Sequence, residues 1–202
     1  MDHSLLQGIE DAIRAVSLLK EEEALRFMEQ AAHWIADCFS NKGKLLIAGN
    51  GGSLCDALHF AEELTGQFRK KRPALPAIAL ADPGHLTCVG NDMGFDSVFS
   101  RGVEAFGCKG DLLILLTTSG NSPNLLAAAY EAKRIGLKTI AFLGKTGGRL
   151  KGFCDLEWIV SGFPFSDRIQ EAHMTAIHLI IEQVEQKLFY ATQSSFVGTV
   201  AH

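Results

Sequence analysis

The sequence predicts an α/β fold in which a five-stranded parallel sheet is flanked by helices and preceded by an N-terminal helical hairpin. Two observations predict this fold. Five short apolar runs alternate little between apolar and polar residues, which is typical of strands covered on both faces. Helical patterns separate these runs, and strands that alternate with helices form parallel sheets. Because no linker or low-complexity stretch divides the 202 residues, we expect a single domain over 1–202.

The N-terminal helices are expected over about 4–41. Apolar residues recur every three or four positions from Leu5 to Leu19 and again from Leu25 to Cys38, which is the pattern of two amphipathic helices. Gly43 follows the second pattern, and glycine is a common residue just after a helix end. The two helices carry more apolar surface than a five-stranded sheet obviously needs, which indicates a subunit interface.

The sheet core is expected over about 44–162. Its predicted strands are 44–49, 77–81, 112–116, 139–143 and 156–160. The helices predicted between and after them are 54–64, 98–106 and 125–135. A long C-terminal helix is expected over about 167–190, and a loose tail of small and polar residues continues to 202.

Composition and charge exclude several classes of protein. The 19 basic and 23 acidic residues give a net charge of −4, so the chain lacks the basic field of nucleic-acid-binding proteins. The N-terminus does not resemble a signal peptide, and the longest apolar run, Leu112–Leu116, is far shorter than a membrane span. The five cysteines form no C-x-x-C pair, so we expect reduced, mostly buried thiols. We therefore expect a cytoplasmic protein with no nucleic-acid or membrane partner.

Two predicted turns between a strand and a helix carry unusual polar residues. The first, Gly49–Ser53, has three glycines that let the backbone approach a ligand, and Ser53 can cap the next helix. The second, Thr117–Pro123, places Ser122 at an N-cap before Pro123. Ligands of open parallel sheets bind at the carboxyl ends of the strands, where hydroxyls and helix N-termini favour phosphate. These turns predict a phosphorylated small molecule; the alternative is that the hydroxyls only cap helices.

Motifs for nucleotide cofactors fail in this sequence. A dinucleotide fingerprint starting at Gly49 would need glycine where Leu54 stands. A Walker A motif ending at Gly144–Thr146 would need glycine where Thr139 stands. We therefore expect no nucleotide cofactor.

Histidines and acidic residues on the helices are the candidates for chemistry. His59 and Glu63 are four residues apart and share one helix face, so they can meet at one ligand or metal. A surface ion pair is the alternative, and Glu62 is the neighbouring candidate. On the C-terminal helix, His173 lies in the apolar stripe and is expected to be a core histidine. His178 lies off the centre of that stripe and is the better reactive candidate.

Two further sets of polar residues are less decisive. Gln170 and His178 are about 12 Å apart along a helix axis, so both could reach one ion only with extended side chains. The basic run Arg69–Arg72 precedes a proline and is expected to be a solvated loop. Phosphate steering and partner binding are the alternatives for this run.

These turns and pairs together resemble the sugar isomerase (SIS) domain family, from about Leu5 to Leu188. The two polar turns, Gly49–Ser53 and Thr118–Ser122, mark the family as a whole. The branch that isomerises heptose phosphates is marked by further segments, which are His59–Gly66, Gly90–Asp92 with Gly94 and Phe95, and Arg168–Glu171 with His178. The resemblance implies the SIS-type three-layer sandwich for this α/β chain.

The resemblance also implies an activity: isomerisation of D-sedoheptulose 7-phosphate to D-glycero-D-manno-heptose 7-phosphate. This aldose–ketose reaction would be the first step of nucleotide-activated heptose synthesis for lipopolysaccharide or another surface glycan. In the family, the residue matching Glu63 is the base that moves a proton between C1 and C2, and the residue matching His178 is the partner acid. One zinc ion per subunit is implied at His59, Glu63, Gln170 and His178. The implied substrate contacts are Asn50, Gly51, Gly52, Ser53, Glu63, Asn91, Asp92, Thr117, Thr118, Ser119, Ser122, Asp167 and Gln170.

Three positions depart from the family pattern. Leu54 stands where a histidine is common, Gln67 where an arginine is common, and Thr117 where a serine is common. Thr117 keeps the hydroxyl, whereas Gln67 removes a cation from near the site. These departures bear on substrate affinity more than on the type of reaction.

The family implies an assembly and also offers an alternative function. The assembly is a homotetramer with dihedral symmetry and active sites shared between subunits. The alternative function is a non-catalytic SIS-domain protein that binds a replication initiator or senses sugar phosphates. Such relatives share the polar turns but lack the residues that match Glu63 and His178. This sequence has both residues, so the enzyme is the favoured hypothesis.

Overall fold

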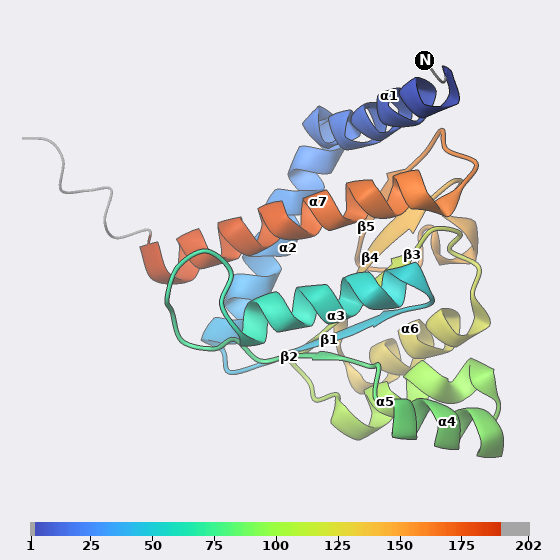
Figure 1. Cartoon of the computed structure of the whole chain (residues 1–202). Coiled ribbons are helices and arrows are strands. Elements are labelled where there is room, and N and C mark those ends of the chain that lie inside the picture. The colour runs from blue at the N-terminus through green and yellow to red at the C-terminus, as the bar shows by residue number, and fades with distance from the viewer. Residues whose placement is uncertain (1–2, 191–202) are drawn as a thin grey trace, which may run out of the picture.

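The computed structural model describes residues 3–190, which form one layered α/β unit around a five-stranded sheet (Figure 1). All strands pair in parallel, in the order β2-β1-β3-β4-β5. The strands are β1 (Leu45–Gly49), β2 (Ala77–Ala79), β3 (Leu112–Thr117), β4 (Lys138–Gly144) and β5 (Leu156–Val160). The predicted fold class is therefore confirmed. The predicted loose tail at 194–202 lies outside the described residues.

The central strands are apolar throughout because each of their faces lies in a separate core. Leu45 and Ile47 of β1 belong to one apolar cluster, and the alternate residue Leu46 belongs to the other. In β3, Leu112 and Leu113 divide between the two clusters in the same way. Because helices cover both sides of the sheet, both faces of each central strand are buried. These strands therefore lack the alternation of apolar and polar residues that a half-exposed strand would show.

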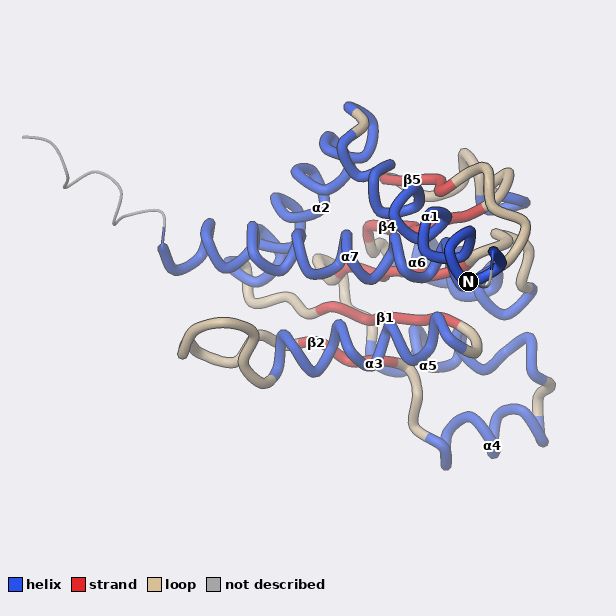
Figure 2. The backbone as a smooth tube through the Cα atoms, turned by 45° about the horizontal axis from the view of Figure 1, so that its top comes forward, coloured by secondary structure: helices blue, strands red, loops and turns tan. Residues whose placement is uncertain are grey.

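Helices form the two outer layers. Apolar residues of α2 and α7 pack with those of α3 on one face of the sheet, and residues of α5 and α6 pack on the other. α4 stands away from the sheet, outside the second layer (Figure 2). The helices are α1 (His3–Ser17), α2 (Glu22–Ser40), α3 (Gly52–Thr65), α4 (Pro83–Asp92), α5 (Val98–Phe106), α6 (Pro123–Ile135) and α7 (Ser166–Glu185), which continues as a π-helical turn over Gln186–Tyr190. No helix among residues 3–190 is long and apolar enough to cross a membrane.

The N-terminal region is helical, as predicted, and α1 lies across α7 at the edge of the molecule (Figure 1). Most of the apolar side chains of α1 are not covered by this chain. Leu5 is 65% exposed and Ile13 is 62% exposed, whereas Ala15 is the buried residue of α1. The expected surplus of apolar surface is therefore concentrated on α1.

One helix was not predicted from the sequence. α4 begins after Asp82, whose carboxylate accepts a hydrogen bond from the backbone N–H of His85 (2.7 Å), and Pro83 occupies the first turn. An acidic N-cap followed by proline is a helix-start signal. The apolar periodicity that should accompany it is missing, because α4 buries only Val89.

The thiols also differ from the prediction. Cys55, Cys88 and Cys108 are exposed, and only Cys38 is buried. The prediction of mostly buried thiols is therefore wrong. Cys55 and Cys88 lie on helices that present one face to solvent, and Cys108 lies in the turn before β3.

Candidate active site

The two polar turns meet because β1 and β3 are neighbours in the sheet, whereas the strand between them in sequence, β2, lies on the other side of β1. This is a topological switch point, where ligands of parallel sheets bind beyond the carboxyl ends of the strands. A cavity of about 260 Å³, here called the loop pocket, opens at this point. Its lining residues are Asn50, Gly52, Ser53, Leu116, Thr117, Thr118, Ser119, Ser122, Leu125, Ser166 and Gln170.

Backbone geometry explains the glycines of these turns. Gly51 is the N-cap of α3 with φ of +56°, a conformation that favours glycine. Gly120 has φ of +65°, and a Cβ there would lie 1.8 Å from the carbonyl oxygen of Gly147. The expected capping role of Ser53 is wrong, because α3 begins one residue earlier than Ser53. Instead, Nε2 of Gln170 donates to the Ser53 hydroxyl at 3.5 Å.

The hydroxyls of the second turn do not form helix-capping hydrogen bonds. Ser122 occupies the N-cap of α6, yet its side chain makes no capping bond. Thr117 accepts a hydrogen bond from the N–H of Gly120 (3.1 Å), and Ser119 accepts one from the N–H of Asn121 (3.3 Å). A hydroxyl that accepts a bond keeps its own proton to donate. The loop pocket can therefore offer several donors to one phosphate.

The loop pocket is braced by an asparagine pair that the sequence analysis missed. The side-chain amides of Asn50 and Asn124 donate to each other, at 2.9 Å in both directions. Asn124 is buried, so the pair fixes the first polar turn against the start of α6. Gly51 lines a neighbouring cavity together with Asn50 and Ser122.

His59 and Glu63 of α3 meet His178 of α7, and these three residues are here called the triad. Nε2 of His59 lies 2.9 Å from Nε2 of His178 and 3.5 Å from a carboxylate oxygen of Glu63. One ligand atom from each residue lies within 4.8 Å of the others. Two imidazoles and a carboxylate form a known catalytic zinc ligand set. The donor set therefore fits a metal ion.

The surroundings of the triad distinguish its members. Glu62 lies against Nδ1 of His59 at 3.4 Å with its side chain 63% exposed, whereas the Glu63 side chain is only 17% exposed. A carboxylate at Nδ1 orients an imidazole and leaves Nε2 for a ligand. The pKa of His178 is lowered, mainly by burial and then by the nearby His59 and Arg69, while Glu63 opposes this shift. His178 is therefore biased toward its neutral form.

Asp56 is a further acidic group that the sequence analysis missed. Its Oδ2 atom is buried without a hydrogen-bond partner, and burial raises its pKa to about 6 against the opposing effect of His59. Asp56 lies on α3 one turn after Ser53 and one turn before His59. Its position three residues before His59, on the same helix face, could have indicated Asp56.

The remaining predicted site residues lie in different places. Asn91 and Asp92 end α4, are exposed and bond to each other at 2.7 Å. Asp167 is exposed and pairs with Arg168 at 3.2 Å. Gln170 lies in the loop pocket beside Ser53. Their expected roles as substrate contacts, and that of Gln170 as a metal ligand, therefore stay predictions.

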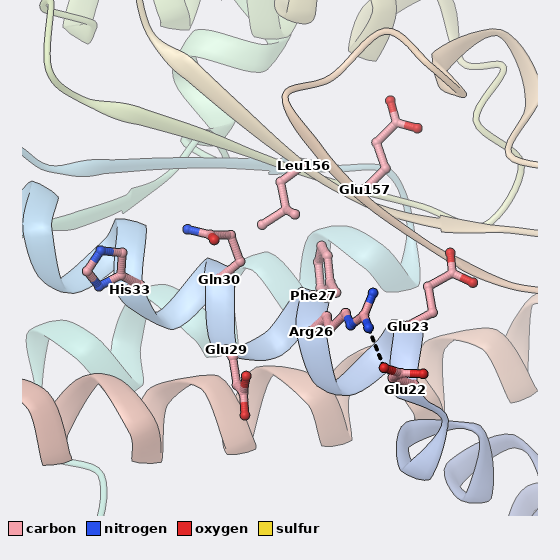
Figure 3. A pocket seen from close by; sticks show the side chains of 9 residues that line it. All are labelled: Glu22, Glu23, Arg26, Phe27, Glu29, Gln30, His33, Leu156 and Glu157. Carbon is pink, nitrogen blue, oxygen red and sulfur yellow. Dashed lines mark hydrogen bonds and ion pairs between the residues drawn. The ribbon is translucent and has the colours of Figure 1, made fainter.

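A larger cavity lies elsewhere, between α2 and the start of β5, and contains none of the predicted site residues (Figure 3). Its volume is about 670 Å³ and several of its lining residues are acidic, as Glu22, Glu23 and Glu29 are. Arg26, the cation in this group, already pairs with Glu22. Such a surface disfavours an anionic ligand, so size alone does not identify the site.

His173 is a core residue, as predicted. It is fully buried, and its Nε2 bonds to the carbonyl oxygen of Leu143 at 3.0 Å. Burial lowers its pKa to about 4, so it is neutral near pH 7. This leaves His59 and His178 as the histidines available for chemistry at the site.

A parallel sheet with hydroxyl-rich turns at its switch point and an ionisable triad on the adjacent helices defines a class of sugar-phosphate proteins. The SIS domain model matches residues 9–144. Phosphoheptose isomerase of Fusobacterium nucleatum is 54% identical over 171 residues, which cover 85% of this chain and 88% of that protein. Phosphoheptose isomerase of Vibrio cholerae is 54% identical over 84% of this chain and 89% of its own length. The chain therefore belongs to the phosphoheptose isomerase family of SIS-domain proteins.

A solved structure agrees with this assignment. Phosphoheptose isomerase from Neisseria gonorrhoeae superimposes with a TM-score of 0.84 and 37% identity, covering 91% of this chain and 97% of that one. Because the superposition covers nearly all of both chains, the likeness extends over the sheet and both outer layers. The expected family and three-layer fold are thus confirmed.

Proposed function

We propose that this chain isomerises D-sedoheptulose 7-phosphate to D-glycero-D-manno-heptose 7-phosphate. The observation that carries the proposal is the triad, in which Glu63 and His178 meet within one chain. A cytoplasmic location and the supply of heptose for lipopolysaccharide or another surface glycan are parts of the same proposal. The direct test is to incubate the pure protein with sedoheptulose 7-phosphate and follow the aldoheptose product. A protein that binds this ketose without converting it would support the non-catalytic alternative.

The spacing of the two parts of the site suits this substrate. The loop pocket includes Ser53, and the triad includes His59 on the same helix. Six residues of α-helix separate them by about 9 Å along the axis. A sugar with phosphate on its last carbon and a reactive carbonyl at the other end needs two such separated subsites.

The residues of the triad can move the protons of this isomerisation. Glu63 takes the proton from C1 of the ketose and returns it to C2, so that a cis-enediol links ketose and aldose. His178 exchanges the proton between the two sugar oxygens. A positioned carboxylate and imidazole are typical general acid–base groups. Partial burial of Glu63 keeps its basic oxygen close to the reacting carbons and away from bulk water.

Zinc is the proposed metal of the triad, with His59, Glu63 and His178 as ligands and Gln170 as the expected fourth. Bound zinc would polarise the sugar carbonyl as a Lewis acid. We expect protein purified without chelator to contain about one zinc per chain. Removal of the metal by a chelator is expected to lower turnover at least tenfold, and added zinc should restore it. Full activity of the metal-free protein would leave these residues as proton carriers only.

The loop pocket is the proposed phosphate subsite. We expect Ser119→Ala and Ser122→Ala each to weaken substrate binding by roughly 1–2 kcal/mol, because each removes a donor to a charged group. The effect should appear in KM or in a directly measured Kd. Ser100→Ala is the matched control, because it removes a hydroxyl on α5 that bonds to the carbonyl of Ser97, outside the pocket. A crystal structure with the substrate phosphate bound elsewhere would contradict this assignment.

A homotetramer with dihedral symmetry and shared active sites is the proposed assembly. The exposed apolar stripe of α1, which includes Leu5, Ile9 and Ile13, supports it, because such surface usually marks an interface. Light scattering at micromolar concentration is expected to give about four times the mass of one chain. Ile13→Glu should shift the mass downward. A wild-type mass near that of a single chain would refute the assembly.

A further inference from the structure

The segment between α3 and β2 is held against α7 by two ion pairs. Arg69 pairs with Glu182 at 2.6 Å, and Arg72 pairs with Glu185 at 2.7 Å. The second pair is buried, with the side chains of Arg72 and Glu185 only 1% and 4% exposed. The prediction of a solvated loop is therefore wrong for Arg72. Burying a charged pair is costly unless its remaining hydrogen bonds are satisfied, so the other partners of this guanidinium are informative.

Those partners are backbone carbonyls at the end of α3. Arg72 donates through Nη2 to the carbonyl of Glu63 at 2.6 Å, and through Nη1 to those of Leu64 (2.7 Å), Gly66 (3.3 Å) and Pro73 (3.1 Å). The last carbonyls of a helix lack partners within the helix, and a cation there is favourable. One guanidinium thus joins the turn that carries Glu63 to the partner carboxylate on α7.

The same segment also contacts His178. The ring of Phe68 stacks on the imidazole of His178, with centroids 5.8 Å apart and planes 23° apart. The His59–His178 contact crosses the boundary between α3 and α7, which is the boundary that Arg72 spans. Any shift of one helix along the other would separate Glu63 from His178.

We propose that Arg72, together with Glu185, is a positioning residue of the isomerase. This inference rests on the proposed function. The guanidinium fixes the last turn of α3 against α7 and so sets the position of Glu63 relative to His178. It does not line the loop pocket, whose residues come from the ends of β1 and β3 and from the first turns of α3, α6 and α7, whereas Glu185 ends α7. Loss of Arg72 should therefore impair the chemical step more than substrate binding.

The test is a split between kcat and KM. In Arg72→Met the five hydrogen bonds are lost while most of the aliphatic stem remains. We expect kcat to fall about 10²-fold, the cost of a displacement near 1 Å, while KM stays within about threefold. Arg72→Lys keeps the charge but not the planar fork, so it should recover part of the lost kcat. If Arg72→Met does not fold, kcat and KM are compared with wild type in Arg72→Lys and Glu185→Gln instead.

A second ion pair, in which the carboxylate is buried and the ammonium is partly exposed, provides the matched control. Lys44 and Asp111 pair at 2.5 Å, and Asp111 is 4% exposed. They precede β1 and β3, at the opposite edge of the sheet from the loop pocket. We expect Asp111→Asn and the Arg72 variants all to lower Tm. In Asp111→Asn, however, kcat per folded chain should stay within about twofold of wild type. Equal losses of kcat in Asp111→Asn and Arg72→Met, or a wild-type kcat in Arg72→Met, would overturn the positioning role.

Zinc binding gives a readout that does not depend on turnover. Zinc alone, titrated against a competing chelator, should bind Arg72→Met about tenfold more weakly than wild type and Asp111→Asn equally well. If the wild-type chain binds zinc but does not isomerise the ketose, the proposed function fails and this readout decides the role of Arg72. An active wild type with unchanged Arg72 variants overturns the positioning role alone. A wild type with neither property overturns both.

Discussion

Glu63→Gln is expected to abolish turnover, with a loss of at least about 10³-fold in kcat, while the fold and substrate binding remain intact. The substitution keeps the shape of the side chain but removes the basic oxygen that would take the proton from C1. The Glu63 side chain is 17% exposed and faces His59 at 3.5 Å, so solvent cannot easily substitute for it. The measurement is steady-state conversion of sedoheptulose 7-phosphate, with substrate binding measured separately by calorimetry.

Glu62→Gln is the matched control on the same helix. Glu62 touches only Nδ1 of His59, and its side chain is 63% exposed. Because Glu62 only orients His59, its substitution should lower kcat about tenfold. The two neighbouring substitutions should therefore differ by about two orders of magnitude. Near-normal turnover of the Glu63 variant would remove Glu63 from the role of base, whatever the Glu62 variant does.

The sequence was sufficient to predict the sheet because its physical signal is local. Each strand is a short apolar run, and runs such as Leu112–Leu116 lack alternation for the reason that the structure reveals, namely burial on both faces. The prediction of a phosphorylated ligand at the two polar turns needed only the rule that ligands of parallel sheets bind at the carboxyl ends of the strands. The pairing of β1 with β3 then placed Asn50 beside Ser122 in the loop pocket.

What could not be predicted depends on contacts between distant residues. Arg72 belongs to a run of basic residues, and the sequence does not indicate that Glu185, 113 positions later, would bury it. α4 lacks apolar periodicity because it stands away from the sheet and buries only Val89. Asp56 lies three residues before His59 on the same helix face, but its raised pKa arises mainly from burial, which spacing does not reveal.

The triad also bears on whether the proposed tetramer shares its active sites between subunits. The notable feature is that Glu63 and His178 meet within a single chain. Neither residue therefore has to be supplied by a neighbouring subunit. Any sharing between subunits would involve other residues, for which the exposed Asn91 and Asp92 at the end of α4 are candidates.

His178→Gln is accordingly expected to lower kcat about 10²- to 10⁴-fold, because glutamine occupies similar space but cannot exchange a proton between the sugar oxygens. His33→Gln is the control, since His33 is exposed on α2 and pairs only with Asp37; its activity should match wild type. The decisive step is to coexpress the Glu63→Gln and His178→Gln chains with different tags and purify the mixed oligomer. Each site of that oligomer would still lack one member of the triad, so no activity should return. Recovery on mixing would instead mean that the two residues serve one site from different chains.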